Sequence, residues 1–406
     1  MSPHPAISDD WGTNVPLDDV GGKVAIVGVG ESEHSRASGR TPTEIAATAV
    51  ERALADAGLR PEDVDGVMLG PGVPDQLDAA AFHAHFGTAH DLWESTGGGG
   101  MRWAATAPVP AAEALASGEA SVIVNSFAVA WATQRGSMTG GPGQMHAEER
   151  FKGTLEAPFG WFPQPVYFAT IARRHMHEYG TTEAQLGAIA VACREHANAT
   201  PAAVMHGRPL SLEDYLASPY LAEPFRKEDC CLISDGGAAY VMTTPERARD
   251  LDRSSVEVAG VGLGRSHTGT HWAQQRDFTS TPQVFAGPAA FAMAGIQPGD
   301  VDVATAYDPF TIVSLMQIED LGFCAKGDGG AFAEAGELRV DGGALPYNPH
   351  GGMLSHAYVL GIAHVVEVVR QLRGEAANQV AGAEIGIYGG YTGPEAAILV
   401  LRRSAA

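Results

Sequence analysis

Short apolar runs that end in small residues alternate with longer alanine-rich segments along most of this chain. Residues 24–30 form such a run, which predicts a buried strand, and the alanine-rich segment after it predicts a helix that ends at Gly58. Pro61 and the acidic residues that follow then enter a short turn before the next apolar strand. The first part of the chain therefore predicts a β-α-β unit.

The same pattern returns later in the chain, which indicates an internal duplication. Three segments of the first half have a counterpart in the second: residues 53–65 match 290–302, residues 24–30 match 256–262, and residues 235–242 match 393–400. We therefore predict two β-α-β halves, residues 23–255 and 256–406, after an N-terminal extension of residues 1–22. Residues 127–225 have no counterpart in the second half and predict an inserted loop domain.

Each half also has a glycine run in front of a predicted helix. Gly99 and Gly100 end the run in the first half, and Gly351 and Gly352 form it in the second. Glycines at this position let a ligand approach the backbone, and the N–H groups and dipole of the helix favour negative charge. We expect the two glycine elements to face each other around one site.

Composition limits the classes of partner. The 406 residues carry 26 Lys+Arg against 48 Asp+Glu, a formal net charge of -22, which argues against binding to nucleic acid or to an anionic membrane. The first residues do not resemble a signal peptide, and no apolar run is long enough to cross a bilayer, so we expect a cytoplasmic protein. The four cysteines show neither disulfide nor metal spacing.

The segment 348–361, with Asn348, Gly351, Gly352, His356 and Gly361, resembles the thiolase motif N-x-x-G-G-x-x-x-G-H-P-x-G. Together with the duplicated plan, it makes the chain similar to the thiolase superfamily, in the branch of sterol carrier protein thiolases and bacterial lipid-transfer proteins. The resemblance implies an α/β fold, with duplicated β-α-β halves in five layers (α-β-α-β-α), and a homodimer.

Both reactive cysteines of a thiolase are missing. Cys193, Cys230, Cys231 and Cys324 all lie outside the thiolase motifs. Residues 93–101 stand where the first cysteine belongs, and Ile387 or Tyr388 stands where the second belongs. A thiolase forms an acyl-thioester on one cysteine and moves a proton with the other, so this chain must perform different chemistry.

The pattern of tyrosines resembles the steroid side-chain aldolases of actinobacterial sterol catabolism, which perform a retro-aldol cleavage on a thiolase fold. The resemblance implies that Tyr307, in Tyr-Asp-Pro-Phe, and Tyr358 form the acid/base pair. His356 is a candidate to stabilise an enolate, and Asp308 and Asn348 are further candidate catalytic residues. Asp308 is either a catalyst or a helix-capping group, and Asn348 either supports the turn or orients a water. A phenol can take and return a proton, and no covalent intermediate is needed, which is consistent with the loss of the cysteines.

Coenzyme A is expected only as part of the substrate, with no separate cofactor and no metal. Arg226 and Lys227 are candidate contacts for its phosphates. Nicotinamide binding is not expected, because Glu33 stands where a dinucleotide loop after residues 28–30 requires its third glycine.

Two alternatives remain open. The chain is either a thiolase-type enzyme with another nucleophile, such as Ser95 or Thr96, or a non-catalytic carrier of lipid or acyl-CoA. The resemblance also implies a separate partner protein with an OB fold and a zinc ribbon, which would form a heterotetramer with the dimer.

Overall fold

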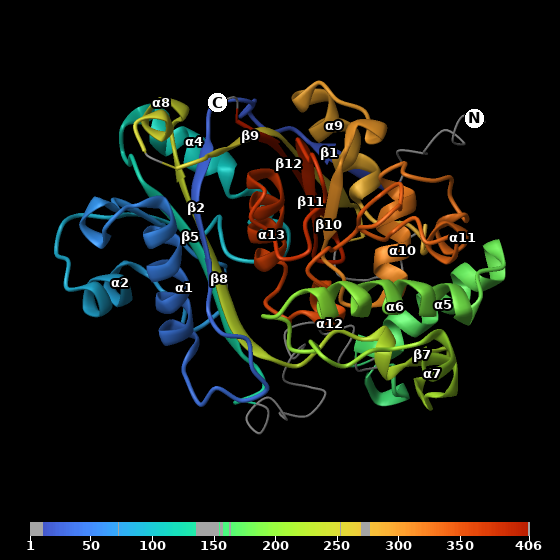
Figure 1. Ribbon diagram of the computed structural model, residues 1–406. Coiled ribbons are helices and arrows are strands. Elements are labelled where there is room, and N and C mark those ends of the chain that lie inside the picture. Colours follow the sequence, from blue (N-terminus) through green and yellow to red (C-terminus); the bar gives the residue numbers. More distant parts are fainter. Residues whose placement is uncertain are drawn as a thin grey trace.

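The computed structural model describes residues 11–71, 73–134, 154, 157–161, 164–251, 253–268 and 277–404. No described helix combines the length and the apolar character needed to cross a membrane. The described chain forms one main sheet, flanked and divided by helices, and a separate two-stranded sheet (Figure 1).

The first half contributes five strands to the main sheet: β2 (Ala25–Glu31), β3 (Gly66–Met68), β4 (Trp93–Ser95), β5 (Ile123–Ala130) and β8 (Asp235–Thr243). Its helices outside the insertion are α1 (Pro42–Ala57), α2 (Ala79–Phe86), α3 (Met101–Thr106), α4 (Pro108–Ser117) and α8 (Pro245–Arg249). Helix α1 begins at a capping box of Thr41 and Glu44 and ends at Gly58 with φ of 70°, which confirms the predicted helix end.

The second half repeats this order with β9 (Val256–Ser266), β10 (Val303–Ala306), β11 (Ile385–Tyr391) and β12 (Glu395–Arg403). Its helices are α9 (Gln283–Ala294), α10 (Thr311–Asp320), α11 (Gly329–Glu334), α12 (Gly352–Ser355) and α13 (Ile362–Arg373). The repeated turn is a 3-10 turn in both halves, Pro61–Asp63 and Pro298–Asp300. The helix predicted after Gly352 is broken, since residues 356–361 separate α12 from α13.

The strand order confirms the duplication. The main sheet runs β10-β11-β12-β9-β2-β8-β5-β3-β4, so β9-β12-β11-β10 mirrors β2-β8-β5-β3 about the junction of the halves. Only Ala25 with Glu257 and Ile26 with Val256 pair across that junction. Strand β1 (Gly12–Val15) pairs antiparallel with β9, so part of the predicted N-terminal extension belongs to the sheet of the second half.

The helices divide the molecule into the five predicted layers. Helix α1 covers the outer face of the first-half strands, and α9 covers the outer face of the second-half strands. Helix α13 packs against strands of both halves in the centre of the molecule (Figure 1) and also contacts α3. The residues of α13 are buried on nearly every side of the helix, apart from the last turn. This burial is expected of a helix in the central layer.

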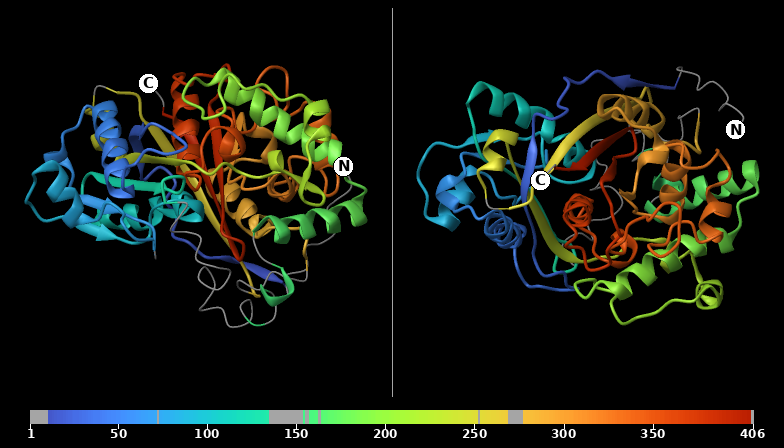
Figure 2. Two further views of the ribbon diagram at one scale, coloured as in Figure 1. Left: turned by 90° about the horizontal axis from the view of Figure 1, so that it is seen from below. Right: turned by 45° about the horizontal axis from the view of Figure 1, so that its top comes forward.

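The inserted segment is more helical than the sequence indicated, and its predicted start is wrong. Residues 127–130 belong to β5, so the insertion begins after Ala130. It contains α5 (Gln164–Tyr179), α6 (Glu183–Ala199) and α7 (Leu212–Ala217), with a hairpin of β6 (Tyr220–Ala222) and β7 (Phe225–Arg226). Helix α6 packs against α10, α11 and α12, so the insertion lies against the second half (Figure 2).

Candidate active site

The loops that precede the two central helices meet, as the glycine runs predicted. The N–H of Met101, at the start of α3, donates to the carbonyl of Leu360, in the loop before α13. A Cβ atom at Gly100 would lie 2.7 Å from that carbonyl oxygen, so only glycine allows this approach. Met101 and Leu360 themselves have φ of 54° and 50°. Such strained backbone persists only where the surrounding structure holds it, and it is common at functional sites.

Tyr307 and Tyr358 come together beside these loops. Tyr307 directly follows β10, and its N–H donates to the carbonyl of Gly389 at 2.8 Å. Tyr358 lies between α12 and α13, where its N–H donates to Ser234 Oγ at 2.9 Å and its ring meets the Trp131 ring edge-on at 5.3 Å. A side-chain hydrogen bond joins the two phenols. The structure thus brings together residues that are 51 positions apart by their numbers.

The two phenols differ in their electrostatics. Burial raises the pKa of Tyr307 well above its usual value, and the hydrogen bond with Tyr358 raises it further. Burial also raises the pKa of Tyr358, but there the same hydrogen bond opposes the shift. The charged form of Tyr388 would raise the pKa of Tyr307 as well. Tyr358 is therefore the phenol better placed to hold a negative charge.

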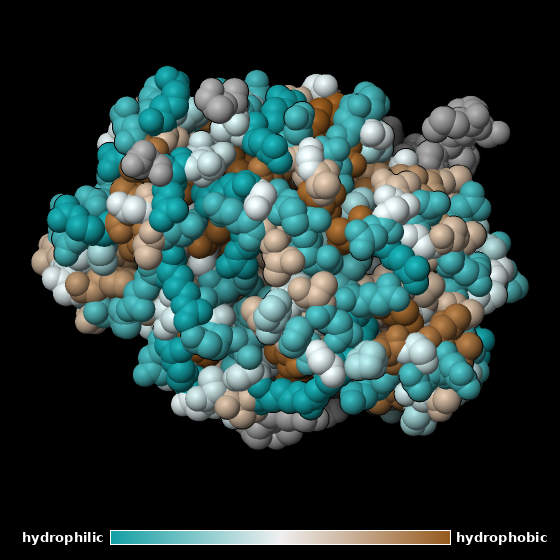
Figure 3. Space-filling model, in the orientation of Figure 1, coloured by the Kyte–Doolittle hydropathy of each residue, from teal (hydrophilic) through white to brown (hydrophobic). Residues whose placement is uncertain are grey.

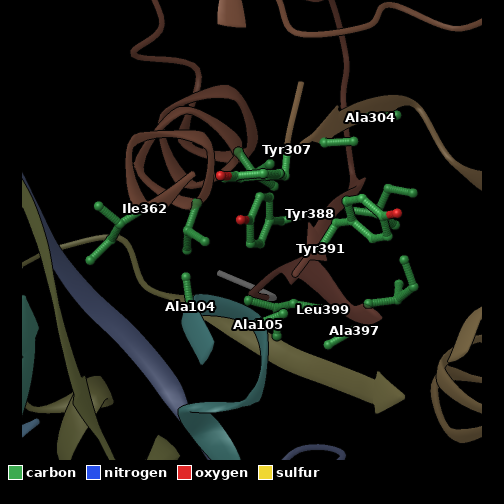
Figure 4. Close-up of a cluster of buried hydrophobic side chains, with 14 of the residues drawn as sticks. Ala104, Ala105, Ala304, Tyr307, Ile362, Tyr388, Tyr391, Ala397 and Leu399 are labelled. Carbon is green, nitrogen blue, oxygen red and sulfur yellow. The ribbon is translucent and has the colours of Figure 1, made fainter. Parts of the chain in front are cut away.

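Aromatic residues and small apolar side chains surround Tyr307. Figure 4 shows the rings of Tyr307 and Tyr388 close together, with Ile362 of α13 and Ala104 of α3 nearby. The hydroxyl of Tyr388 donates to the carbonyl of Met101 at 2.9 Å. A Cβ atom at Gly361 would lie 2.0 Å from that hydroxyl oxygen. Tyr388, one of the two candidates for the position of the second thiolase cysteine, therefore contacts both loops.

Asn348 holds the strand end that carries Tyr307. Its side-chain oxygen accepts from the N–H of Ala306 at 2.9 Å, and its side-chain nitrogen donates to the carbonyl of Ala306 at 3.2 Å. Both polar atoms are thus engaged with the residue next to Tyr307. These contacts position the backbone next to Tyr307, and a part of Asn348 in the reaction stays a prediction.

Asp308 occupies the helix opening that we expected to receive a ligand. Its carboxylate accepts from the N–H groups of Met353 at 2.8 Å and Leu354 at 3.3 Å, the first turn of α12. A Cβ atom at Gly352 would lie 2.1 Å from Asp308 Oδ2. The expectation that Gly352 opens a binding site for a negatively charged ligand is therefore wrong at this helix end, because Asp308 already supplies that charge.

The other predicted glycines also serve contacts within the chain. The N–H of Gly99 donates to Asn125 Oδ1 at 2.7 Å, and a Cβ atom at Gly351 would lie 2.7 Å from the Cβ of Ala197 on α6. These glycines let segments of the protein pack closely. None of their described contacts marks a ligand site.

His356 lies in a row of four buried imidazole rings, here called the histidine cluster, and not beside the tyrosine pair. Its ring lies 4.8 Å from that of His34 and 4.9 Å from that of His350, which is 4.7 Å from the ring of His364. His356 Nε2 and His34 Nε2 both lie within hydrogen-bond distance of Glu31 Oε1, at 3.1 and 3.0 Å. Burial lowers the pKa of His356. The expected contact of His356 with an enolate therefore finds no support in its described contacts.

Glu31, His34 and His356 also form a grouping that could ligate a metal, with ligand atoms all within 4.8 Å of one another. Sequence spacing gave no sign of it, because the residues come from opposite ends of the chain. Arg370 pairs with the same Glu31 carboxylate, and Arg52 donates to the Glu31 carbonyl at 2.7 Å. The positive charges of these two guanidinium groups would repel a metal ion bound at Glu31.

The two predicted phosphate contacts, Arg226 and Lys227, differ in their exposure. Arg226 is buried, pairs with Glu183 at 2.7 Å and stacks 4.5 Å from the centre of the Tyr220 ring. It is therefore not available to a phosphate, and that prediction is wrong. Lys227 is exposed, so its role stays a prediction.

Cys231 is the neighbour of the tyrosine pair that the sequence did not reveal. Its charged form would raise the pKa of both Tyr307 and Tyr358. Burial raises the pKa of the Cys231 thiol well above its usual value, so the thiol stays protonated and is a poor nucleophile. No motif spacing links Cys231 to the tyrosines, and only the fold brings them together.

Known proteins match this chain over nearly its whole length. Residues 264–403 match the protein family described as "Thiolase C-terminal domain-like". The 17-hydroxy-3-oxo-4-pregnene-20-carboxyl-CoA lyase of Mycobacterium tuberculosis is 39% identical over 373 residues, which cover 89% of this chain and 95% of that protein. The chain belongs to the aldolase branch of the thiolase superfamily.

Two further aldolases are similar to this chain. The steroid side-chain-cleaving aldolase of Thermomonospora curvata is 37% identical over 368 residues, which cover 88% of this chain and 92% of that protein. The solved Ltp2-ChsH2(DUF35) aldolase has a TM-score of 0.85 and 35% identity, with 96% of this chain and 100% of that chain covered. The predicted thiolase fold and the predicted class of enzyme, a carbon–carbon lyase, are confirmed.

Proposed function

We propose that the protein cleaves a β-hydroxyacyl-CoA, with a steroid as the acyl group, in a retro-aldol reaction that releases a ketone and propionyl-CoA. The observation that carries this proposal is the placement of two phenols where the loops before α3 and α13 meet. Tyr358 lies in the loop before α13, and the ring of Tyr307 lies against Gly361 of the same loop. The similarity to two steroid-cleaving enzymes supports the choice of substrate.

In the proposed reaction, Tyr358 removes the proton of the β-hydroxyl group. The Cα–Cβ bond then breaks, its electron pair moves into the thioester enolate, and the β-carbon becomes the ketone. Tyr307 donates its hydrogen bond to Tyr358 and so lowers the energy of the Tyr358 phenolate. Protonation of Cα by a tyrosine hydroxyl completes the cycle, without net uptake of protons and without a covalent intermediate.

Asn348 and Asp308 support this pair from behind. Asn348 fixes the backbone at Ala306, next to Tyr307, and Asp308 fixes α12, which leads to the Tyr358 loop. His364 Nε2 lies 2.9 Å from Asp308 Oδ1 and keeps that carboxylate in place. We assign these residues to positioning, because their described contacts are with the protein itself.

The test is a product assay. The purified protein is incubated with a steroid β-hydroxyacyl-CoA, with and without a co-expressed DUF35 partner, and the ketone and propionyl-CoA are measured by mass spectrometry. We expect equal amounts of both products. An acylated protein in the same samples would instead indicate a thiolase with a new nucleophile, and binding without turnover would indicate a carrier.

The contacts of Ser95 argue against the first alternative. Its hydroxyl accepts a hydrogen bond from the N–H of Gly97 at 3.1 Å, and no acid or base contacts it in the described part of the chain. An alcohol needs a neighbouring base to become a nucleophile.

We further propose a homodimer that binds two copies of a partner with an OB fold and a zinc ribbon. Strand β4 ends the main sheet, and an exposed edge is suited to pair with a second copy. The Ltp2-ChsH2(DUF35) aldolase includes a DUF35 protein, which supports a two-component enzyme here. Figure 3 shows apolar residues among hydrophilic ones over the inserted helices, where Leu212, Leu216 and Leu221 are exposed. Light scattering of the co-expressed proteins tests the stoichiometry.

A further inference from the structure

A cleft of about 500 Å³ lies beside the loop that carries Tyr358. Three separate segments line it: residues 32–36 after β2, Arg52 on α1, and residues 201–208 after α6, of which 205–207 do not reach the cleft. Each segment contributes one arginine, namely Arg36, Arg52 and Arg208. None of these residues has a part in the chemistry proposed above.

The cleft is positively charged in a protein with a net charge of -22. Its single carboxylate, Glu33, pairs with Arg52. The guanidinium of Arg36 contacts only the sulfur of Met205 at 3.6 Å, and neither Arg36 nor Arg208 forms an ion pair with any residue that the structure describes. Two guanidinium groups without carboxylate partners thus line one concave surface, and their fork of N–H donors suits a phosphate.

Two further groups add to this character. Ser35 lines the cleft, and its buried hydroxyl has no hydrogen-bond partner among the residues that the structure describes. Arg194 lies near Arg208, and its side chain donates to the carbonyl of Arg208 at 3.2 Å. Burial lowers the pKa of Arg194 and the positive charge of Arg208 lowers it as well, whereas the negative charge of Glu228 raises it. An anion in the cleft would relieve the repulsion between Arg194 and Arg208.

The cleft is also connected to the segment that leads to Tyr358. The N–H of Val204 donates to the carbonyl of His356 at 2.9 Å, and the N–H of Met205 donates to the carbonyl of Ser355 at 3.2 Å. His34 lines the cleft and lies 4.8 Å from the His356 ring. A ligand in the cleft would therefore lie next to a segment that is hydrogen-bonded to the backbone just before Tyr358.

We propose that this cleft binds phosphate groups through Arg36 and Arg208. The phosphate is either that of the coenzyme A portion of the substrate or a free anion, since the chemistry of recognition is the same. The first source rests on the proposed function, whereas anion binding itself does not. The cleft replaces the buried Arg226 as the candidate phosphate site.

The test is isothermal titration calorimetry of the full chain, with its partner if the two co-purify, against coenzyme A, inorganic pyrophosphate and pantetheine. Arg36→Gln and Arg208→Gln remove one guanidinium each, and Arg249→Gln is the matched control, because Arg249 is exposed and pairs with Glu246 at 3.3 Å. Each cleft variant should bind the phosphate ligand about tenfold more weakly, as expected for a charge-assisted hydrogen bond. Pantetheine, which has no phosphate, and the control variant should show no change.

The ligands distinguish the two sources. A loss of both coenzyme A and pyrophosphate affinity assigns the site to the substrate, and a loss of pyrophosphate affinity alone assigns it to a free anion. The proposal is overturned if the Arg36→Gln/Arg208→Gln double variant binds both phosphate ligands as tightly as the wild type, or if the wild type binds neither. Because binding is measured without turnover, a protein that fails the product assay can still pass this one.

Discussion

The proton-transfer role of Tyr358 and Tyr307 can be separated from a structural role by removing one hydroxyl at a time. Tyr358→Phe and Tyr307→Phe keep the ring, so the packing of Tyr358 against Trp131 at 5.3 Å is preserved. Each change removes the hydrogen bond between the phenols, which costs about 1 kcal/mol of stability. The effect on folding should therefore be small for both variants.

The effect on the rate should be much larger. A general acid–base group contributes about 10²–10⁴-fold, or about 3–5 kcal/mol of transition-state stabilisation. We expect the loss in kcat with little change in KM, because neither hydroxyl is assigned to ground-state binding. Since Tyr307 acts through Tyr358, the double variant should be hardly slower than Tyr358→Phe alone.

Tyr240→Phe is the matched control. The Tyr240 ring is fully buried on β8, and its hydroxyl donates to the carbonyl of Ala104 at 2.8 Å. This variant should lose about 1–3 kcal/mol of stability, because it leaves a buried carbonyl without its donor, yet it should keep its kcat. If Tyr358→Phe and Tyr307→Phe behave like Tyr240→Phe, with a lower Tm and kcat within about threefold of the wild type, the proposed mechanism is refuted.

Three other outcomes are expected. Cys231→Ala should keep kcat within about threefold because its thiol is protonated, and a fall of more than about a hundredfold in a folded variant would contradict the cysteine-free mechanism. Burial raises the pKa of Glu367 to about 7 from an ordinary 4.5, so between these values the unfolded chain releases a proton that the folded chain keeps. Relative to Glu367→Gln, the wild type should therefore lose up to about 3 kcal/mol of stability as the pH rises through this window, and urea titrations that show no such trend would disprove the shift. Gly361→Ala should destabilise the protein by about 2 kcal/mol more than Gly382→Ala in thermal melts, since both have positive φ but only the first meets a neighbour, the Tyr388 hydroxyl; equal melting temperatures would count against the close contact.

The sequence by itself determined the duplication and the layers. Residues 53–65 and 290–302 share the same helix end and turn before a strand, and these are local features that glycine, proline and apolar spacing specify directly. The two tyrosines were also predicted from the sequence as site residues, because each stands in a motif of nearby residues. The resemblance of those motifs predicted the class of enzyme, which the relatives confirm.

The sequence did not decide which polar groups face the site. Asp308 and His356 stand in the expected motifs, yet Asp308 caps α12 and the ring of His356 faces Glu31. Arg226 stands in a basic pair in the sequence, but in the structure it forms an ion pair with Glu183. The reason is that a charged side chain takes the nearest opposite partner in space once it is buried, and that partner comes from another part of the chain.

Only the tertiary structure decided the neighbourhoods that span the chain. Cys231 lies beside Tyr307 and Tyr358, and Arg36 lines the same cleft as Arg208, with no spacing rule to connect them. The inserted segment packs on the second half although it lies within the first half in sequence. Hydrophobic burial brings these segments together through contacts between distant residues, and the pattern within one segment carries no information about which distant segment covers it.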